Sequence, residues 1–195
     1  YTALLPWTYF SQALINSTNS LVNASQLLNK VYFPRIILPL TPVFSKLADF
    51  VIAFIILIAM MLYYGIYPGL NIVYLIPLII LMILNASGIG LWLSAMAIQY
   101  RDVKFAITFL SQILMYAAPV VFPSSLILEK YGNTAYMLYG IYPMVGVIEG
   151  FRACLLGSQP MPWELIFIGT ISTLLLFFSG FFYFRRMERH FADVA

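Results

Sequence analysis

Residues 50–100 read FVIAFIILIAMMLYYGIYPGLNIVYLIPLIILMILNASGIGLWLSAMAIQY and contain no Asp, Glu, Lys or Arg. This uncharged run is far longer than a buried helix of a soluble protein requires, because about 20 residues already cross the hydrocarbon core of a bilayer. The whole chain has 195 residues, of which 63% are hydrophobic and 9% charged, and its mean hydropathy is +0.93. A water-soluble domain cannot bury that much apolar surface. The sequence therefore predicts one integral membrane domain over residues 1–195.

Helices are the predicted secondary structure, because lipid offers no partner for backbone groups and the alternating pattern of barrel strands is absent. The expected fold is an all-α bundle of about five membrane spans. These spans are Pro6–Leu28, Pro42–Tyr64, Leu70–Ile98, Phe105–Leu128 and Trp163–Phe184. The apolar, glycine-rich segment Glu129–Pro162 is too short to cross twice, which indicates short re-entrant or interfacial helices on the outer side.

Basic residues indicate the orientation, because cytoplasmic connections carry an excess of Lys and Arg. They follow the first, third and fifth spans, at Lys30, Arg35, Arg101, Lys104, Arg185, Arg186 and Arg189. The opposite side has none at Gly65–Gly69, and only Lys130 and Arg152 in the long outer segment. The sequence therefore predicts a cytoplasmic C-terminus. The chain also begins abruptly at apolar sequence, which indicates an N-terminal truncation.

The first predicted span is too polar for a helix that faces lipid. Its amides recur at a 4-3-4-3 spacing, which places them within an arc of about 80° on one helix face. This amide stripe consists of Gln12, Asn16, Asn19, Asn23 and Gln26. An unpaired amide in hydrocarbon costs several kcal/mol, so the stripe must face protein or water. Hydrogen bonds between helices and the lining of a translocation path are both open interpretations.

The fourth predicted span carries an aromatic stripe with a similar spacing, formed by Phe105, Phe109, Gln112 and Tyr116. Aromatic faces beside an amide or a phenol suit a sugar, whose ring presents C–H groups on its faces and hydroxyls at its edge. Ordinary packing within the bundle is the alternative for each ring. The two stripes together favour a path for a glycan.

Two charge pairs have the i,i+3 spacing that allows contact on one helix. Lys46 and Asp49 would pair near the start of the second span, with a functional intramembrane carboxylate as the alternative interpretation of Asp49. Glu149 and Arg152 would pair in the outer segment, where irregular backbone packs on protein or lines a cavity. The segment Glu129–Pro162 is therefore a candidate gate or lid.

The connection Asn29–Pro42 contains prolines that prevent a continuous helix between the first two spans. Exposed Tyr32 and Phe33, beside Lys30 and Arg35, would form a docking knob. The alternative is an amphipathic connector that rests among lipid headgroups.

Other classes of function find little support in the sequence. It contains no phosphate-binding loop, no metalloprotease motif and no basic patch for nucleic acid, and its single cysteine is Cys154. An ion-coupled carrier would need several buried carboxylates or histidines, and only Asp49 qualifies. A membrane-embedded glycosyl- or acyltransferase would need a His/Asp pair near the surface, which is also missing.

Several stretches match one known family in order along the chain: PWTYFSQA (6–13), NKVYFPR (29–35), YRDV (100–103), PVVFPS (119–124), VIEGFR (147–152) and FRRMER (184–189). Through them the chain resembles the membrane subunits of type-2 ABC exporters, which move polysaccharide, O-antigen or teichoic-acid chains across the bacterial inner membrane. The expected substrate is then a lipid-linked polysaccharide. Export of drugs or other lipophilic compounds is the alternative.

This resemblance implies a six-helix subunit, so that the five predicted spans are its second to sixth helices. It implies a homodimer with two ATP-binding cassette subunits, which bind ATP and magnesium, so that no cofactor and no enzymatic activity belong to this chain. It further implies that Lys30, Tyr32, Phe33 and Arg35 contact the ATPase. It also implies that Tyr142–Arg152 belongs to outer gate helices, with Tyr142, Pro143, Glu149 and Arg152 as the expected gate residues. Tyr142 departs from the family pattern, in which Asn often precedes the Pro-Met pair.

Overall fold

The structure is a computed structural model, and it describes residues 1–24, 33–67, 69–157 and 160–188. Helices make up almost all of these ranges. They are α1 (Leu4–Asn23), α3 (Ile37–Tyr63), the short 3-10 helix η1 (Leu70–Tyr74), α4 (Leu75–Gln99), α5 (Val103–Ala117), α6 (Ser125–Gly140), α7 (Pro143–Leu156) and α8 (Trp163–Glu188). The described residues contain no strand, which confirms the prediction of an all-α fold.

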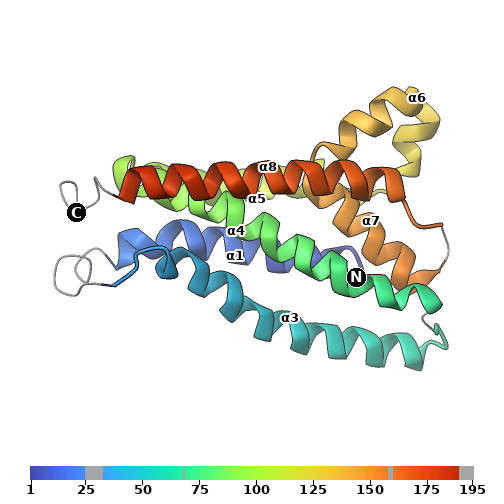
Figure 1. Cartoon of the computed structure of the whole chain (residues 1–195). Coiled ribbons are helices and arrows are strands. Elements are labelled where there is room, and N and C mark those ends of the chain that lie inside the picture. Colours follow the sequence, from blue (N-terminus) through green and yellow to red (C-terminus); the bar gives the residue numbers. More distant parts are fainter. Residues whose placement is uncertain (25–32, 68, 158–159, 189–195) are drawn as a thin grey trace.

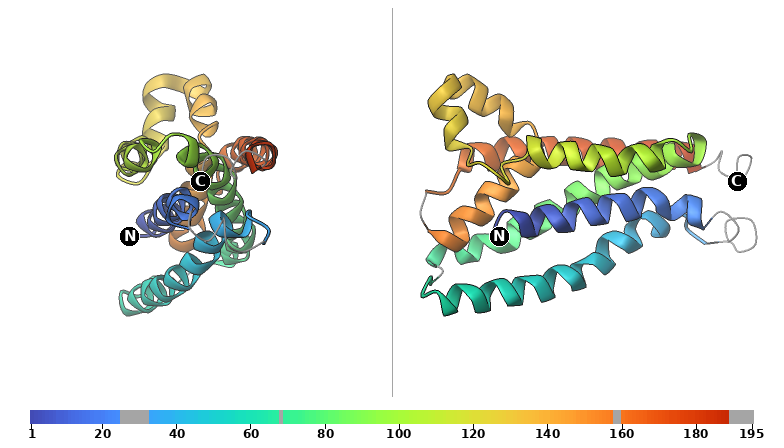
Figure 2. Two further views of the ribbon diagram at one scale, coloured as in Figure 1. Left: turned by 90° about the vertical axis from the view of Figure 1, so that its left-hand side faces the viewer. Right: turned by 180° about the vertical axis from the view of Figure 1, so that it is seen from behind.

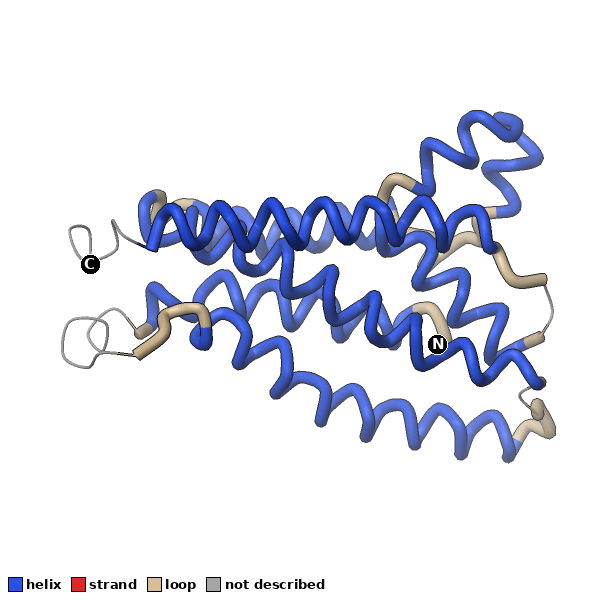
Figure 3. The backbone as a smooth tube through the Cα atoms, in the orientation of Figure 1, coloured by secondary structure: helices blue, strands red, loops and turns tan. Residues whose placement is uncertain are grey.

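The long helices run side by side along one axis, with α4 at the centre of the bundle (Figure 1). α4 packs against α1, α3, α7 and α8, whereas α5 packs against α1 and α4. The end view in Figure 2 places α3 and α6 at opposite margins. The chain turns at the two ends of the bundle (Figure 3), and α6 and α7 lie at the end opposite the C-terminus.

Three helices in the described ranges are long and apolar enough to cross a membrane, namely Ile37–Tyr63, Asn71–Gln99 and Trp163–Glu188. They correspond to the second, third and fifth predicted spans. α1 has 20 residues but carries the amides, and α5 is a shorter apolar helix of 15 residues. Large apolar side chains on the long helices remain exposed, such as Ile55 on α3 and Phe182 on α8. This surface suits lipid and makes the chain a membrane protein.

Several predicted span boundaries were wrong. The first span ends at Asn23 instead of Leu28. The second span begins at Ile37 instead of Pro42. Pro42 is the sixth residue of α3, beyond the first turn, so it removes one backbone hydrogen bond without ending the helix. The fourth span ends at Ala117 instead of Leu128. Ala118 is extended with a ψ of 153°, as expected for the residue before Pro119, and the chain turns there.

The outer segment folds as two short helices, α6 and α7, in line with the prediction for Glu129–Pro162. Gly132 has a φ of +78° and kinks α6, a conformation that glycine adopts without steric cost. Pro143 is the first residue of α7, where its missing N–H is harmless.

The core has two parts. The larger cluster joins α1, α3, α4 and α7 around side chains such as Phe10, Met82 and Phe151. The smaller cluster, at the C-terminal end of the bundle, consists of Leu21, Leu91, Ala95 and Phe184. Lipid tails are as apolar as these side chains, so close packing between the helices, and not transfer from water, is what burial contributes here.

Candidate functional site

The amide stripe of α1 lies on the side of the helix that the rest of the chain leaves uncovered. Gln12 and Asn23 are exposed and Asn16 and Asn19 are half-buried, whereas the opposite face of the helix is buried. Within the described residues, the stripe forms no hydrogen bond to another helix: Asn16 donates to the backbone oxygen of Gln12 at 2.8 Å, and the buried Oδ1 of Asn19 has no partner. Gln26 lies outside the described residues. Contacts among the described residues therefore do not explain the stripe.

The aromatic stripe of α5 also points away from the bundle. Ile107 and Ser111 are buried on the side that faces α1 and α4. Phe105 precedes Ile107 by two residues, so its side chain points about 200° around the helix axis from that of the buried Ile107. The whole stripe is exposed, at Phe105, Phe109, Gln112 and Tyr116. It remains available to a partner subunit, to lipid or to a substrate.

Lys46 and Asp49 form the predicted ion pair, with the Lys46 Nζ 2.7 Å from the Asp49 Oδ2. The prediction that this pair lies near a helix end was wrong. Because α3 begins at Ile37 and has 27 residues, both charges fall near its middle. The Asp49 side chain is 66% exposed and the Lys46 side chain 32%. A charge at this depth needs water or protein beside it.

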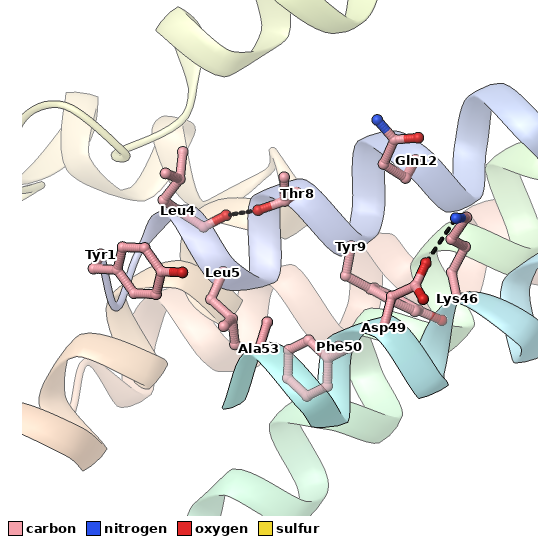
Figure 4. Close-up of a pocket in the computed structure, with 10 residues that line it drawn as sticks. All are labelled: Tyr1, Leu4, Leu5, Thr8, Tyr9, Gln12, Lys46, Asp49, Phe50 and Ala53. Carbon is pink, nitrogen blue, oxygen red and sulfur yellow. Dashed lines mark hydrogen bonds and ion pairs between the residues drawn. The ribbon is translucent and has the colours of Figure 1, made fainter. Parts of the chain in front are cut away.

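A pocket of about 300 Å³ lies between α1 and α3, and both this ion pair and Gln12 line it (Figure 4). The aromatic side chains of Tyr1, Tyr9 and Phe50 form much of its apolar lining. The Tyr9 hydroxyl donates to the backbone oxygen of Val43 at 2.9 Å, which holds its ring between the two helices. The polar surface therefore continues from the amide stripe of α1 onto α3, an extension that the sequence analysis missed.

At the C-terminal end of the bundle, Arg35 links the start of α3 to the end of α8. Its Nη1 donates to the backbone oxygen of Glu188 at 2.9 Å. The last carbonyls of a helix lack partners within it and carry the negative end of the helix dipole, so a guanidinium there is stabilising.

Phe33 is only half-exposed, unlike the fully exposed knob that the sequence suggested. Its side chain packs against the small C-terminal cluster that contains Leu21, Leu91 and Phe184. Lys30 and Tyr32, the other two residues of the predicted ATPase contact, lie outside the described residues. Phe33 and Arg35 nevertheless attach this segment to α1, α4 and α8.

Glu149 and Arg152 form the second predicted ion pair, which is buried. The Arg152 Nη1 lies 2.6 Å from the Glu149 Oε1, and the Glu149 side chain is 3% exposed. The backbone N–H of Ser124 donates to the same oxygen at 2.8 Å, and the Arg152 Nη2 donates to the Pro119 oxygen at 2.7 Å. The pair thus ties α7 to the connection between α5 and α6.

Tyr142 and Pro143, the other residues of the predicted outer gate, form the start of α7. Tyr142 has an extended backbone and a half-buried side chain, and Pro143 is buried. The buried hydroxyl of Tyr142 has no hydrogen-bond partner in the described chain. Nearby, the Tyr139 hydroxyl donates to the Ala117 oxygen at 2.8 Å, which links α6 to the end of α5.

Comparison with known proteins identifies similar membrane subunits, although no family model matches the sequence. The chain is 25% identical over 194 residues to the O-antigen export system permease protein RfbA of Klebsiella pneumoniae, an alignment that covers 99% of this chain and 73% of that protein. A protein of the same description from Myxococcus xanthus is 25% identical over 190 residues, with 96% and 72% covered. These similarities confirm the resemblance to exporter permeases.

Proposed function

We propose that this chain is the transmembrane subunit of an ATP-driven exporter that moves a polysaccharide or lipid-linked glycan across the bacterial inner membrane. The observation that carries this proposal is the uncovered polar surface formed by the amide stripe and the Lys46–Asp49 pair in an otherwise apolar bundle. A surface of amides and charges has no partner in lipid, but it suits hydrated hydroxyl groups. The similarity to O-antigen export permeases supports the same function.

The functional unit in this proposal is a homodimer with two ATP-binding cassette subunits, which bind ATP and magnesium. Residues 1–195 belong to a type-2 ABC transporter transmembrane domain. A second copy of the chain would cover exposed faces of α1 and α5, which make few contacts of their own on these sides. The C-terminal end of the bundle faces the cytoplasm in this arrangement, as the distribution of Lys and Arg favours.

The proposed mechanism begins with closure of the ATP-binding subunits around ATP. Their movement enters through Lys30, Tyr32, Phe33 and Arg35 and shifts α1 relative to α5, which opens a path. The glycan then slides along the aromatic stripe, while the amide stripe exchanges hydrogen bonds with successive hydroxyls. Tyr142, Pro143, Glu149 and Arg152 form the outer gate, and the hydrogen bonds of Glu149 and Arg152 support a coupled movement of α7 and the α5–α6 connection.

Substitution of Asn16, Asn19 and Asn23 together by alanine tests the role of the amide stripe. Each hydrogen bond lost between an amide and a glycan hydroxyl costs about 1 kcal/mol, so export of the glycan is expected to fall at least about tenfold. Surface glycan measured with a specific antibody gives the export rate, and an immunoblot of membranes gives the subunit abundance, which should not change.

The matched control replaces three polar residues of α8, Thr170, Ser172 and Ser179, which donate only to carbonyls of their own helix. This variant should export normally. If the amide variant loses abundance as much as export, the stripe packs helices together and does not line the path.

Substitution of Arg35 by alanine tests the link between the predicted ATPase contact and α8. It removes a charged donor from the Glu188 carbonyl, which should lower the stability of the helix end by about 1–2 kcal/mol. We expect the purified complex to hydrolyse more ATP for each glycan exported. The control is Arg101→Ala, which removes an exposed cation between α4 and α5. An equal amount of ATP hydrolysed per glycan exported in the two variants would refute the link.

Co-purification of the tagged full-length subunit tests the proposal as a whole. Mass spectrometry should identify an ATP-binding cassette subunit, and the complex should hydrolyse ATP. Tyr32→Ala with Phe33→Ala should release that subunit. A pure preparation without ATPase would contradict the exporter and would favour a carrier driven by an ion gradient, or a transferase that forms product without ATPase.

A further inference from the structure

The end of the bundle opposite the C-terminus contains a second pocket, with a volume of about 450 Å³. It lies among α6, α7 and the start of α8, and its lining shares no residue with either stripe or with the Lys46–Asp49 pair. Its lining combines hydroxyl, carboxyl and aromatic groups, contributed by Ser124, Ser125, Tyr136, Glu149, Trp163 and Glu164. Small-molecule sites commonly have volumes of about 300–1,000 Å³, so the pocket is large enough for a small ligand.

A fixed carboxylate forms the buried side of this pocket. Glu149 and Ser124 are 3% and 4% exposed, and both line the pocket. The hydrogen bonds that hold Glu149, from the Ser124 N–H and from Arg152, both end on its Oε1. These bonds hold the carboxylate in one orientation before any ligand arrives. A preorganised, charged acceptor of this kind forms strong hydrogen bonds with hydroxyl donors.

Aromatic groups form the open side of the pocket. Trp163 is 53% exposed, and its ring packs edge-on against Tyr74 with 4.9 Å between centroids. This contact restricts the indole while half of its surface remains accessible. Burial raises the pKa of Tyr136 above its ordinary value of 10.0; the charges of Glu149 and Glu164 add to the increase, and contact with Ser124 opposes it. The phenol therefore stays protonated and can donate a hydrogen bond.

We propose that this pocket binds one or two units of the exported glycan, and that it selects neutral or amino sugars over acidic ones. The aromatic groups suit the C–H faces of a sugar ring, and the hydroxyls and carboxylates suit its edge. The lining contains Glu149 and Glu164 but no Lys or Arg, and the adjoining Arg152 balances only one of these charges. A phosphate or a uronic acid would be repelled. This inference rests on the proposed function and adds a site and a class of sugar.

Photocrosslinking in the full-length exporter tests contact with the native glycan. Leu128 lines the pocket, whereas Leu126, on the same helix, does not. Both leucines are exposed, at 42% and 51%, which makes them a matched pair. Benzoylphenylalanine at position 128 should crosslink to glycan at least about tenfold more than at position 126, and Trp163→Ala should reduce the product severalfold. Equal crosslinking from both positions, or none from position 128, would overturn the proposal.

Saturation-transfer NMR on the purified complex tests the class of sugar, with chitobiose, glucosamine and glucuronic acid as probes. Chitobiose and glucosamine should give signals that Trp163→Ala reduces severalfold and that Leu126→Ala leaves unchanged. Glucuronic acid should bind only when Glu164→Gln removes a negative charge from the rim. Stronger binding of glucuronic acid than of chitobiose to the unmodified complex would refute the selectivity.

Glycan export by the unmodified complex, measured in the cells used for crosslinking, separates two kinds of failure. Normal export without crosslinking at the pocket would refute the pocket alone. Unchanged surface glycan in a strain that lacks the subunit, with no ATPase bound to the purified subunit, would refute the proposed function itself.

Discussion

Glu149→Gln is expected to lower the free energy of unfolding of this subunit by about 3 kcal/mol. The substitution keeps the volume of the side chain but leaves Arg152, whose side chain is 15% exposed, without its carboxylate partner. It also weakens the acceptor of the Ser124 N–H, a buried backbone group. Removal of one partner from a buried pair is costly because the other charge stays buried and unpaired. Titration of the full-length subunit from detergent into SDS, followed by circular dichroism, measures the effect.

Asp49→Asn provides the matched control for this prediction. Lys46 and Asp49 have the same i,i+3 spacing and a similar N–O distance of 2.7 Å, but their side chains are 32% and 66% exposed. Exposed pairs contribute about 0–1 kcal/mol, so the control should hardly change stability. It should instead impair export, because Asp49 belongs to the polar surface beside Gln12. Equal destabilisation by both substitutions would contradict the role of burial.

Gly180→Val is the second substitution with a large expected effect, since it should separate α4 from α8. A Cβ at Gly180 would overlap the backbone oxygen of Gly88, and a Cβ at Gly88 would lie 2.7 Å from the Cα of Phe177. Both obstacles are backbone atoms, which cannot turn aside as a side chain can. Overpacking of this kind costs about 1–3 kcal/mol or more, and the valine variant should accumulate to less than half of the normal level.

The amount of folded subunit in membranes, measured by immunoblot and fluorescence-detected size exclusion, checks this result. Gly69→Ala is the control, because its Cβ would meet no atom within 4 Å and the φ of Gly69 is −77°. That variant should accumulate normally. Normal accumulation of Gly180→Val would show that α4 and α8 can separate without loss of folding.

The sequence predicted helices and local pairs because these depend on nearby residues. Uncharged runs of bilayer length allow only helices, and residues three apart meet on one helix, which placed Glu149 beside Arg152. The helix ends were less predictable, since α3 continues through Pro42 whereas α5 ends before Pro119. Because α3 starts at Ile37, the Lys46–Asp49 pair lies near the middle of the helix and not near its end.

Contacts between distant segments were decided only by the tertiary structure. Ser124 and Glu149 are 25 residues apart and Arg35 and Glu188 are 153 residues apart, and no periodic pattern connects either pair. The pocket that contains Trp163 likewise has no sequence signal, because three separate helices supply its lining. The sequence by itself determined that lipid surrounds the chain, that the chain folds as helices and that one face of α1 is polar. The way the helices pack decided which of these residues meet, because packing depends on the shapes of whole helix surfaces.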